Sequence, residues 1–330
     1  MQCFQKVKGG INNSLVCPAK LSSAGWTIVS LIIGQAAGCA KAFESKRKDN
    51  RMSTSYRFEV EKLECIAVAD GSNDYEAGLL FTNAPQKELR QALDKRGLGL
   101  EELDIPYTCL AVKVNAQWVL VDTGAGVREE AQVGRVVQNL VAAGIDPAEV
   151  KVVVLTHGHT DHVGGLTDEE GQLRFGEARY IMGKREWDFW RSRETLKEMG
   201  WERVIPFMER KLGSIEGRVE LIEGEREILP GLRVIPAAGH TPGHMVAVFS
   251  SGGEELWSTG DALIHPIHLE HLEWYTVFDL APQEAIETKR QILDEVENGA
   301  TVHAFHFPFP GIGRVIREGK RWRWQPVERE

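Results

Sequence analysis

The first clear periodic pattern along the chain covers residues 56–69, where apolar and polar residues alternate. A period of two is typical of a β-strand with one buried face. The turn-forming residues 70–73 predict that this strand ends there. Two further β-rich runs, 107–114 and 118–121, are separated by three residues and predict a hairpin.

Helical spacing is found in four places. Residues 86–96 suit a short helix, and residues 128–143 place their apolar side chains on one helical face, with Gly144 as the stop. Residues 184–211 form a longer helical stretch that is rich in tryptophan. Residues 282–296 predict the strongest helix, because proline occupies its first turn and glycine follows its end.

A short apolar run at 151–155 (KVVVL) predicts a strand buried on both faces. Later strand-like segments are residues 219–222, 232–237, 245–249, 255–258 and, as the last strand, 301–305. The strands come in runs with helices interspersed, so we expect two sheets covered by helices in one domain. We assign residues 52–330 to this single catalytic domain and residues 1–51 to a poorly ordered N-terminal extension.

Composition narrows the class of protein and its partners. The chain is 42% apolar and 26% charged, as in ordinary globular proteins, so it can bury a sizeable core. A net charge of −9, with no basic run interleaved with aromatics, argues against nucleic acid as a partner. No apolar stretch reaches the roughly 18 residues that a membrane-spanning helix needs.

Cysteine usage and the N-terminus bear on the compartment. The five cysteines are scattered without CxxC spacing, which predicts neither a disulfide framework nor a thiolate zinc site and favours the cytoplasm. Residues 26–39 loosely imitate a secretory signal, so export is the alternative if residues 1–39 act as one. Against it, Ala36 stands where such signals favour leucine, and a basic cluster at 46–48 follows the expected cleavage site.

The candidate chemistry begins where the buried strand ends. Residues 157–162 hold three imidazoles and a carboxylate: His157, His159, Asp161 and His162. Imidazole and carboxylate are ligands suited to zinc, iron, manganese or cobalt. Along an extended segment the first two histidines point the same way and can share one ion. A turn at Thr160, followed by a helix start, would aim the other two side chains at a neighbouring ion.

Three more metal-binding side chains follow predicted strands. They are His240 in GHTPG, Asp261 in TGD and His306 in FHFP. Asp122, in VDTG, also ends a predicted strand, and we expect it to orient a ligand and not to bind metal itself.

The combination HxHxDH, GHTPGH, TGDA, VDTG and a late histidine resembles the metallo-β-lactamase superfamily from about Phe58 onwards. The resemblance implies an α/β (α+β) four-layer αββα sandwich with two divalent metal ions, zinc first and manganese, cobalt or iron as alternatives. It assigns His157, His159 and His240 to one ion and Asp161, His162 and His306 to the other. Asp261 would bridge them, and Asp161 and Asp261 would be the catalytic residues.

A closer resemblance concerns residues 306–313 (HFPFPGIG), which are similar to the branch with methyl parathion hydrolase, organophosphorus hydrolases and lactonases. It implies hydrolysis of an ester, lactone or phosphotriester of a small apolar molecule through a metal-bridging hydroxide. Acyl-homoserine lactonases place a tyrosine three residues after the bridging aspartate, where this chain has Ile264. The expected partner is a small-molecule substrate, and a homodimer is left open.

Two other functions remain open on the same scaffold. One is an iron-dependent sulfur dioxygenase, which metal analysis and oxygen consumption would reveal, and the other is a non-catalytic metal-binding protein. Among the remaining histidines, we expect His244 to support the site and His303 to point away from His306. We expect His265, His268 and His271 to be partly solvated on a substrate-facing loop, in preference to a third metal site. Trp274 and Phe278 are candidates for the pocket wall.

Overall fold

The computed structural model describes residues 54–127 and 132–328, which form two seven-stranded sheets. In the first sheet the strands follow one another in chain order. They are β1 (Ser55–Val60), β2 (Leu63–Tyr75), β3 (Leu103–Val114), β4 (Gln117–Val121), β5 (Val150–Val154), β6 (Arg179–Gly183) and β7 (Val219–Ile222). Strands β1 to β4 pair antiparallel, and β4 to β7 pair parallel.

The second sheet has the order β14-β13-β12-β11-β10-β9-β8. Its strands are β8 (Arg226–Leu229), β9 (Leu232–Pro236), β10 (Met245–Ser251), β11 (Glu254–Ser258), β12 (Thr301–His303), β13 (Ile312–Glu318) and β14 (Arg321–Pro326). All neighbours are antiparallel except β11 and β12, which are parallel.

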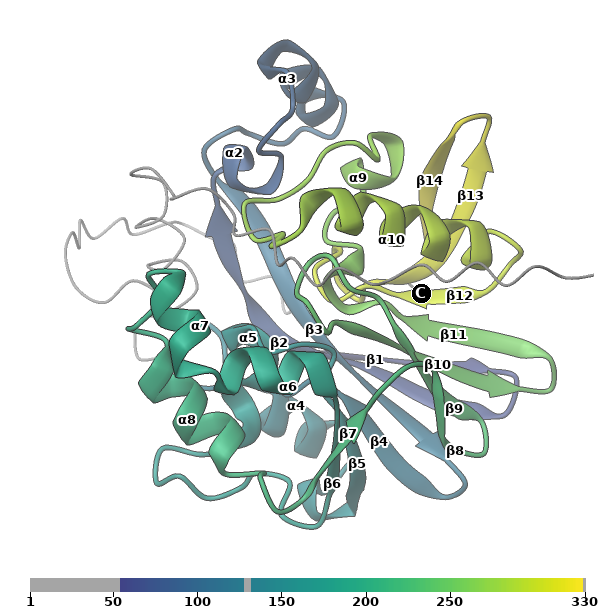
Figure 1. Cartoon of the computed structure of the whole chain (residues 1–330). Coiled ribbons are helices and arrows are strands. Elements are labelled where there is room, and N and C mark those ends of the chain that lie inside the picture. Colours follow the sequence, from purple (N-terminus) through teal and green to yellow (C-terminus); the bar gives the residue numbers. More distant parts are fainter. Residues whose placement is uncertain (1–53, 128–131, 329–330) are drawn as a thin grey trace, which may run out of the picture.

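Helices cover the outer faces of both sheets (Figure 1). On the first sheet lie α4 (Val136–Ala142), α5 (Thr160–Val163), α6 (Lys184–Arg191), α7 (Arg193–Glu198) and α8 (Ile205–Gly213). Against the second lie α9 (Ile267–Glu270) and α10 (Pro282–Val296). Between β2 and β3 the chain forms α2 (Ala77–Leu80) and α3 (Gln86–Asp94), and α3 stands away from the sandwich.

Three buried apolar clusters separate four layers. One joins the first sheet to its helices, for example Val153 to Trp190. A second lies between the sheets and includes Val154 and Phe249, and a third joins the second sheet to α10 through Leu293. The predicted αββα sandwich is therefore confirmed. So is the doubly buried strand at 151–155, since Val153 and Val154 face different clusters.

The first predicted strand is wrong in its boundaries. The chain already turns at Glu61, whose φ is 51°, so residues 56–69 belong to the two paired strands β1 and β2. Residues 70–73 do not form the expected turn, because β2 continues through them with an irregularity between Ala69 and Gly71. The Asp70 carboxylate instead accepts the backbone N–H groups of Ala125 and Val136.

Other predicted elements differ in length. The helix expected at 128–143 begins only at Val136, where Asp70 accepts the first amide, and residues 128–131 lie outside the described part. The stretch 184–211 is divided into α6, α7 and α8, with Ser192 capping α7 through the Thr195 amide. Strand 301–305 is not the last, because β13 and β14 follow it. The helix at 282–296 is confirmed at both ends.

The predictions made for residues 1–51 also lie outside the described residues, so the domain boundary at residue 52 stays a prediction. Within 54–127 and 132–328, no helix combines the length and the apolar character that crossing a bilayer demands.

Candidate metal centre

The segment that carries four of the seven predicted donors leaves the first sheet at the end of β5. His157 and His159 lie in extended chain, and α5 begins at Thr160, as the sequence predicts. The first helical turn therefore displaces Asp161 and His162 from the direction of the two preceding histidines. Because the strand is followed at once by the start of a helix, these six residues can supply donors to two separate groups.

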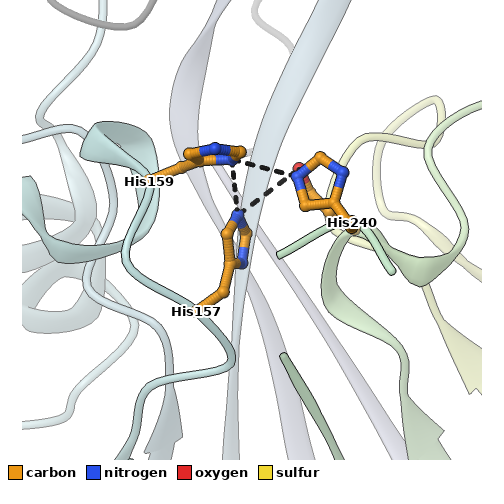
Figure 2. A group of neighbouring side chains, drawn as sticks. His157, His159 and His240 are labelled. Carbon is orange, nitrogen blue, oxygen red and sulfur yellow. Dashed lines mark hydrogen bonds and ion pairs between the residues drawn. The ribbon is translucent and has the colours of Figure 1, made fainter. Parts of the chain in front are cut away.

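Three histidines converge on one point (Figure 2). His159 Nδ1 lies 2.9 Å from His157 Nε2 and 3.0 Å from His240 Nε2. His240 comes from the loop between β9 and β10, so this group joins the two sheets. All three side chains are buried. One ring nitrogen cannot donate to one neighbour and accept from another, so a cation that receives all three lone pairs fits this arrangement.

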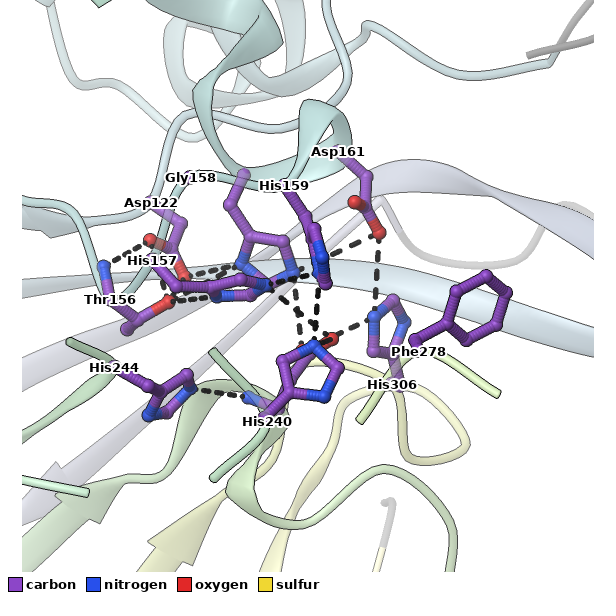
Figure 3. A network of polar contacts seen from close by, with 12 residues as sticks. Asp122, Thr156, His157, Gly158, His159, Asp161, His240, His244, Phe278 and His306 are labelled. Atoms are coloured by element: carbon purple, nitrogen blue, oxygen red, sulfur yellow. Dashed lines mark hydrogen bonds and ion pairs between the residues drawn. The ribbon is translucent and has the colours of Figure 1, made fainter. Parts of the chain in front are cut away.

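A second group lies beside the first (Figure 3). His306, in the turn after β12, places Nε2 3.4 Å from Asp161 Oδ2. His162 Nε2 is 3.8 Å from the same carboxylate oxygen. Their ligand atoms are close enough together to hold one ion.

Asp261 lies between the two groups. Its Oδ2 is 3.2 Å from His240 Nε2 and 3.8 Å from His157 Nε2. Its Oδ1 is 3.1 Å from His162 Nε2 and 3.3 Å from His306 Nε2. One carboxylate oxygen thus faces each group, which is the geometry of a bridging ligand.

Two atoms at this centre indicate that cations complete it. Among the described side chains, His162 Nε2 and Asp261 Oδ1 are buried and lie 3.1 Å apart, but neither atom has a partner in hydrogen-bond geometry. Buried polar atoms left unpaired are costly, and native structures rarely contain them. Both atoms belong to the two donor groups, in each of which the ligand atoms lie within 4.8 Å of one another, so the residues present fit a pair of divalent ions.

The outer ring nitrogens of the histidines are held in place by other groups. Asp122 Oδ2 bonds His162 Nδ1 at 2.8 Å, and Asp279 Oδ1 bonds His240 Nδ1 at 2.8 Å. The Pro106 carbonyl accepts from His306 Nδ1 at 3.1 Å. Such partners select the tautomer that leaves Nε2 free for a metal. Asp122 was expected here, whereas Asp279 carries no motif that the sequence could have revealed.

Nearby carboxylates set the charge of this centre. Burial alone would lower the pKa of His240, but its hydrogen bonds to Asp261 and Asp279 raise it to about 9. Burial would also lower the pKa of His162, but the surrounding carboxylates outweigh it and raise this pKa well above its usual value. Burial and neighbouring histidines lower the pKa of His157 and His159. In the metal-free protein, the cationic ring is therefore favoured at His162 and His240 and disfavoured at His157 and His159.

A pocket opens onto the donors between the two sheets. Its wall contains Asn73, Tyr75, Leu80, Ile105, Tyr107, Ile264 and Phe278, together with donors from both groups. The Tyr75 and Tyr107 hydroxyls are 2.6 Å apart. None of the described residues lining this pocket is a lysine or arginine, so apart from the donor histidines and aspartates its wall is apolar with neutral polar groups.

The two aromatic candidates differ in position. Phe278 lines the pocket, as predicted, and Figure 3 shows it near His306. Trp274 is wrong as a wall residue, since it is buried against Phe81 and stacked on His271 at 3.9 Å.

The remaining histidines have structural contacts. His244 Nε2 accepts the Asp261 backbone N–H at 3.1 Å, which agrees with a supporting role. His265 and His268 are buried and not partly solvated as expected, because both rings pack against Phe81. Within the described residues, they join no group of possible metal ligands. His303 Nδ1 lies 2.9 Å from Ser258 Oγ.

Comparison with known proteins adds a family and several relatives. The model of the metallo-β-lactamase superfamily matches residues 104–301. An N-acyl homoserine lactonase from Bacillus sp is 29% identical over 164 residues, which are 44% of this chain and 58% of that protein. This chain therefore spans little more than half the length of that relative.

Solved structures extend the similarity to most of the chain. The structure of the hydrolase AbOPH, in the β-lactamase superfamily, matches with a TM-score of 0.79 and 26% identity, covering 85% of this chain and 99% of its own. The dizinc quorum-quenching lactonase AidC matches with a TM-score of 0.77 and 24% identity, covering 84% and 100%. At that identity AidC shows a common fold.

Proposed function

Since this chain belongs to the metallo-β-lactamase superfamily, we propose that it is a dinuclear-metal hydrolase that cleaves an ester, lactone or phosphotriester bond in a small, uncharged substrate. The observation that carries this proposal is the placement of Asp261, with one oxygen towards each donor group. A carboxylate in that position can bridge two cations and neutralise part of their charge.

The seven donors would divide between two ions. His157, His159 and His240 would hold one and Asp161, His162 and His306 the other, with Asp261 shared. When bound, two divalent ions, zinc or else manganese, cobalt or iron, lower the pKa of a shared water from about 15.7 towards 7 and so supply hydroxide at neutral pH. The chain's own part is to present neutral imidazoles, bring in two carboxylates and keep the centre enclosed.

Of the two carboxylates, Asp161 is the more exposed. Its side chain is 17% exposed, compared with 6% for Asp261, and both line the pocket. We propose that both act in catalysis, Asp261 by holding the two cations together and Asp161 from the pocket wall.

The pocket supports an uncharged substrate. Leu80, Ile105 and Ile264 offer an apolar surface, and the tyrosine hydroxyls and Asn73 offer neutral polar contacts. Apart from the two ions themselves, an anionic phosphate monoester would meet no cationic side chain of Lys or Arg in this wall. The Bacillus relative is named a lactonase, which supports a lactone among the candidates. The segment 306–313 supports a place in the branch with methyl parathion hydrolase.

A substrate panel tests this proposal. Zinc-, manganese- and cobalt-loaded protein would be assayed with lactones, aryl esters and phosphotriesters, and with 4-nitrophenyl phosphate as the anionic counterpart of a 4-nitrophenyl phosphotriester. We expect turnover of at least one uncharged class and none of the monoester. A preference for the monoester, or no hydrolysis with any metal, would contradict the proposal.

Metal binding should release protons, and the amount should depend on pH. At about pH 7 the metal-free His240 ring, with its pKa raised to about 9, is cationic and must lose one proton to bind metal, and the raised pKa of His162 acts in the same direction. Above about pH 10 the His240 ring is already neutral, so less proton is released and affinity is higher. Calorimetry in buffers of different ionisation enthalpy measures this, and equal release at both pH values would refute it.

A cytoplasmic location and a homodimer stay predictions, which cell fractionation and sizing of the purified protein would test.

A further inference from the structure

Glu186 is a fully buried carboxylate in α6 that belongs to none of the metal-ligand motifs. Its Oε1 accepts the backbone N–H of Gly158 at 2.9 Å and the indole N–H of Trp190 at 2.6 Å. Its Oε2 accepts the backbone N–H of Gly243 at 2.8 Å. One side chain therefore bonds two loops that are distant in the sequence.

Both loops carry donors of the three-histidine group. Gly158 is the residue between His157 and His159, and Gly243 lies three residues after His240. Each carboxylate oxygen of Glu186 accepts a hydrogen bond from one loop, so a single carboxylate connects the two loops. The other donor group has no such contact with Glu186 among the described residues.

The packing around Glu186 leaves little room for the loops to shift. A Cβ on Gly158 would lie 2.3 Å from Trp190 Cδ1, and a Cβ on Gly243 would lie 2.1 Å from the Glu186 backbone nitrogen. The backbone at the start of α6 thus contacts the loop of Gly243, and the Trp190 ring near the end of α6 contacts the loop of Gly158. Because glycine alone permits this approach, the carboxylate is held against two amides whose positions are already restricted.

A buried carboxylate is costly unless several donors satisfy it. Burial raises the pKa of Glu186, while the amides of Gly158 and Gly243, Thr241 and the Trp190 indole act in the opposite direction. These donors belong to the ligand loops or to the helix beside them. Trp190 offsets part of the cost of burying Glu186 from within α6, and the rest is offset when the loops are in the arrangement that brings the three histidines together.

We propose that Glu186 is a positioning residue that sets the separation of the two loops and thereby the affinity of the three-histidine group for its ion. This inference rests on the proposed two-metal site. It assigns Glu186 no contact with substrate or with metal. Glu186 would act by fixing the positions of His157, His159 and His240 in the metal-free protein.

Stepwise cobalt titration against a competing chelator tests this inference with Glu186→Gln, which keeps the side chain's shape but turns one acceptor into a donor facing an N–H group. The step that disappears in His159→Ala identifies the three-histidine ion. In Glu186→Gln we expect the affinity of that step to fall about 10–100-fold, the range found when groups that orient metal ligands are removed. The other step should change less.

Asp70→Asn is the matched control. Asp70 is equally buried and also accepts backbone amides, from Ala125 and Val136, but it does not contact either ligand loop. It should lower the melting temperature and leave the three-histidine step at wild-type affinity. If Glu186→Gln does not fold, Glu186→Asp, whose shorter side chain can no longer hold both loops, undergoes the same titration.

The outcomes separate the two proposals. Wild-type affinity of both steps in the folded Glu186 variant, or equal weakening of both, would overturn the positioning role and leave the two-metal site intact. A wild-type protein that binds no cobalt in either step would instead contradict the proposed function.

Discussion

Asp261→Ala is expected to abolish turnover of every substrate that the wild-type protein hydrolyses. Within residues 54–127 and 132–328, Asp261 is the one carboxylate whose oxygens lie within 3.3 Å of donors from both groups. Without it, two clusters of buried imidazoles would have to bring two dications close together with one negative charge fewer. The fall in kcat/KM should therefore exceed the ~10–100-fold loss typical of groups that only orient ligands.

The matched control for this variant is Asp188→Ala. Asp188 is an exposed aspartate on α6 that pairs only with Lys184 among its described contacts, at 2.5 Å. Exposed pairs of this kind contribute little to stability, so this variant should keep wild-type kinetics. Wild-type rates in Asp261→Ala, measured on protein with a normal circular dichroism spectrum, would refute the bridging role.

His159→Ala should have the second largest effect. His159 Nδ1 is within about 3 Å of a nitrogen on each of the other two histidines of its group, so its loss leaves two imidazoles and one carboxylate oxygen for that ion. We expect the bound metal to fall from two ions to one per chain and turnover to be lost. Elemental analysis after dialysis, together with kcat, measures both.

His303→Ala is the control for removing a buried histidine. His303 is as deeply buried as His159 and contacts Ser258, but it belongs to neither donor group. It should destabilise the protein and still retain two ions. Retention of two ions in His159→Ala would show that this ring is not a ligand.

The donors could be predicted because their signal is local. Six consecutive residues at a strand end carry four donors, and His240, Asp261 and His306 each follow a strand that the sequence also shows. Layer order could be predicted for the same reason, since apolar runs and helical spacing are properties of short segments. That the seven side chains bind metal remains the proposal made above.

Features that depend on distant contacts could not be predicted. Asp70 looks like part of a turn, yet its carboxylate binds amides 55 and 66 residues further along the chain, and this contact decides where α4 begins. Trp274 is a large aromatic residue of the kind that often lines pockets, but its packing with Phe81 buries it.

Asp279 and Glu186 were missed for a related reason. Asp279 reaches His240 across 39 residues, and Glu186 reaches Gly243 across 57. No spacing rule connects such pairs, so only the folded arrangement of the loops reveals them.

A crystal structure of zinc-loaded protein, with anomalous data collected on both sides of the zinc edge, tests the two-metal site directly. We expect two anomalous peaks about 3.5–4 Å apart, one beside each donor group, with Asp261 between them. A single peak, a peak elsewhere, or no peak in protein that hydrolyses its substrate would contradict it.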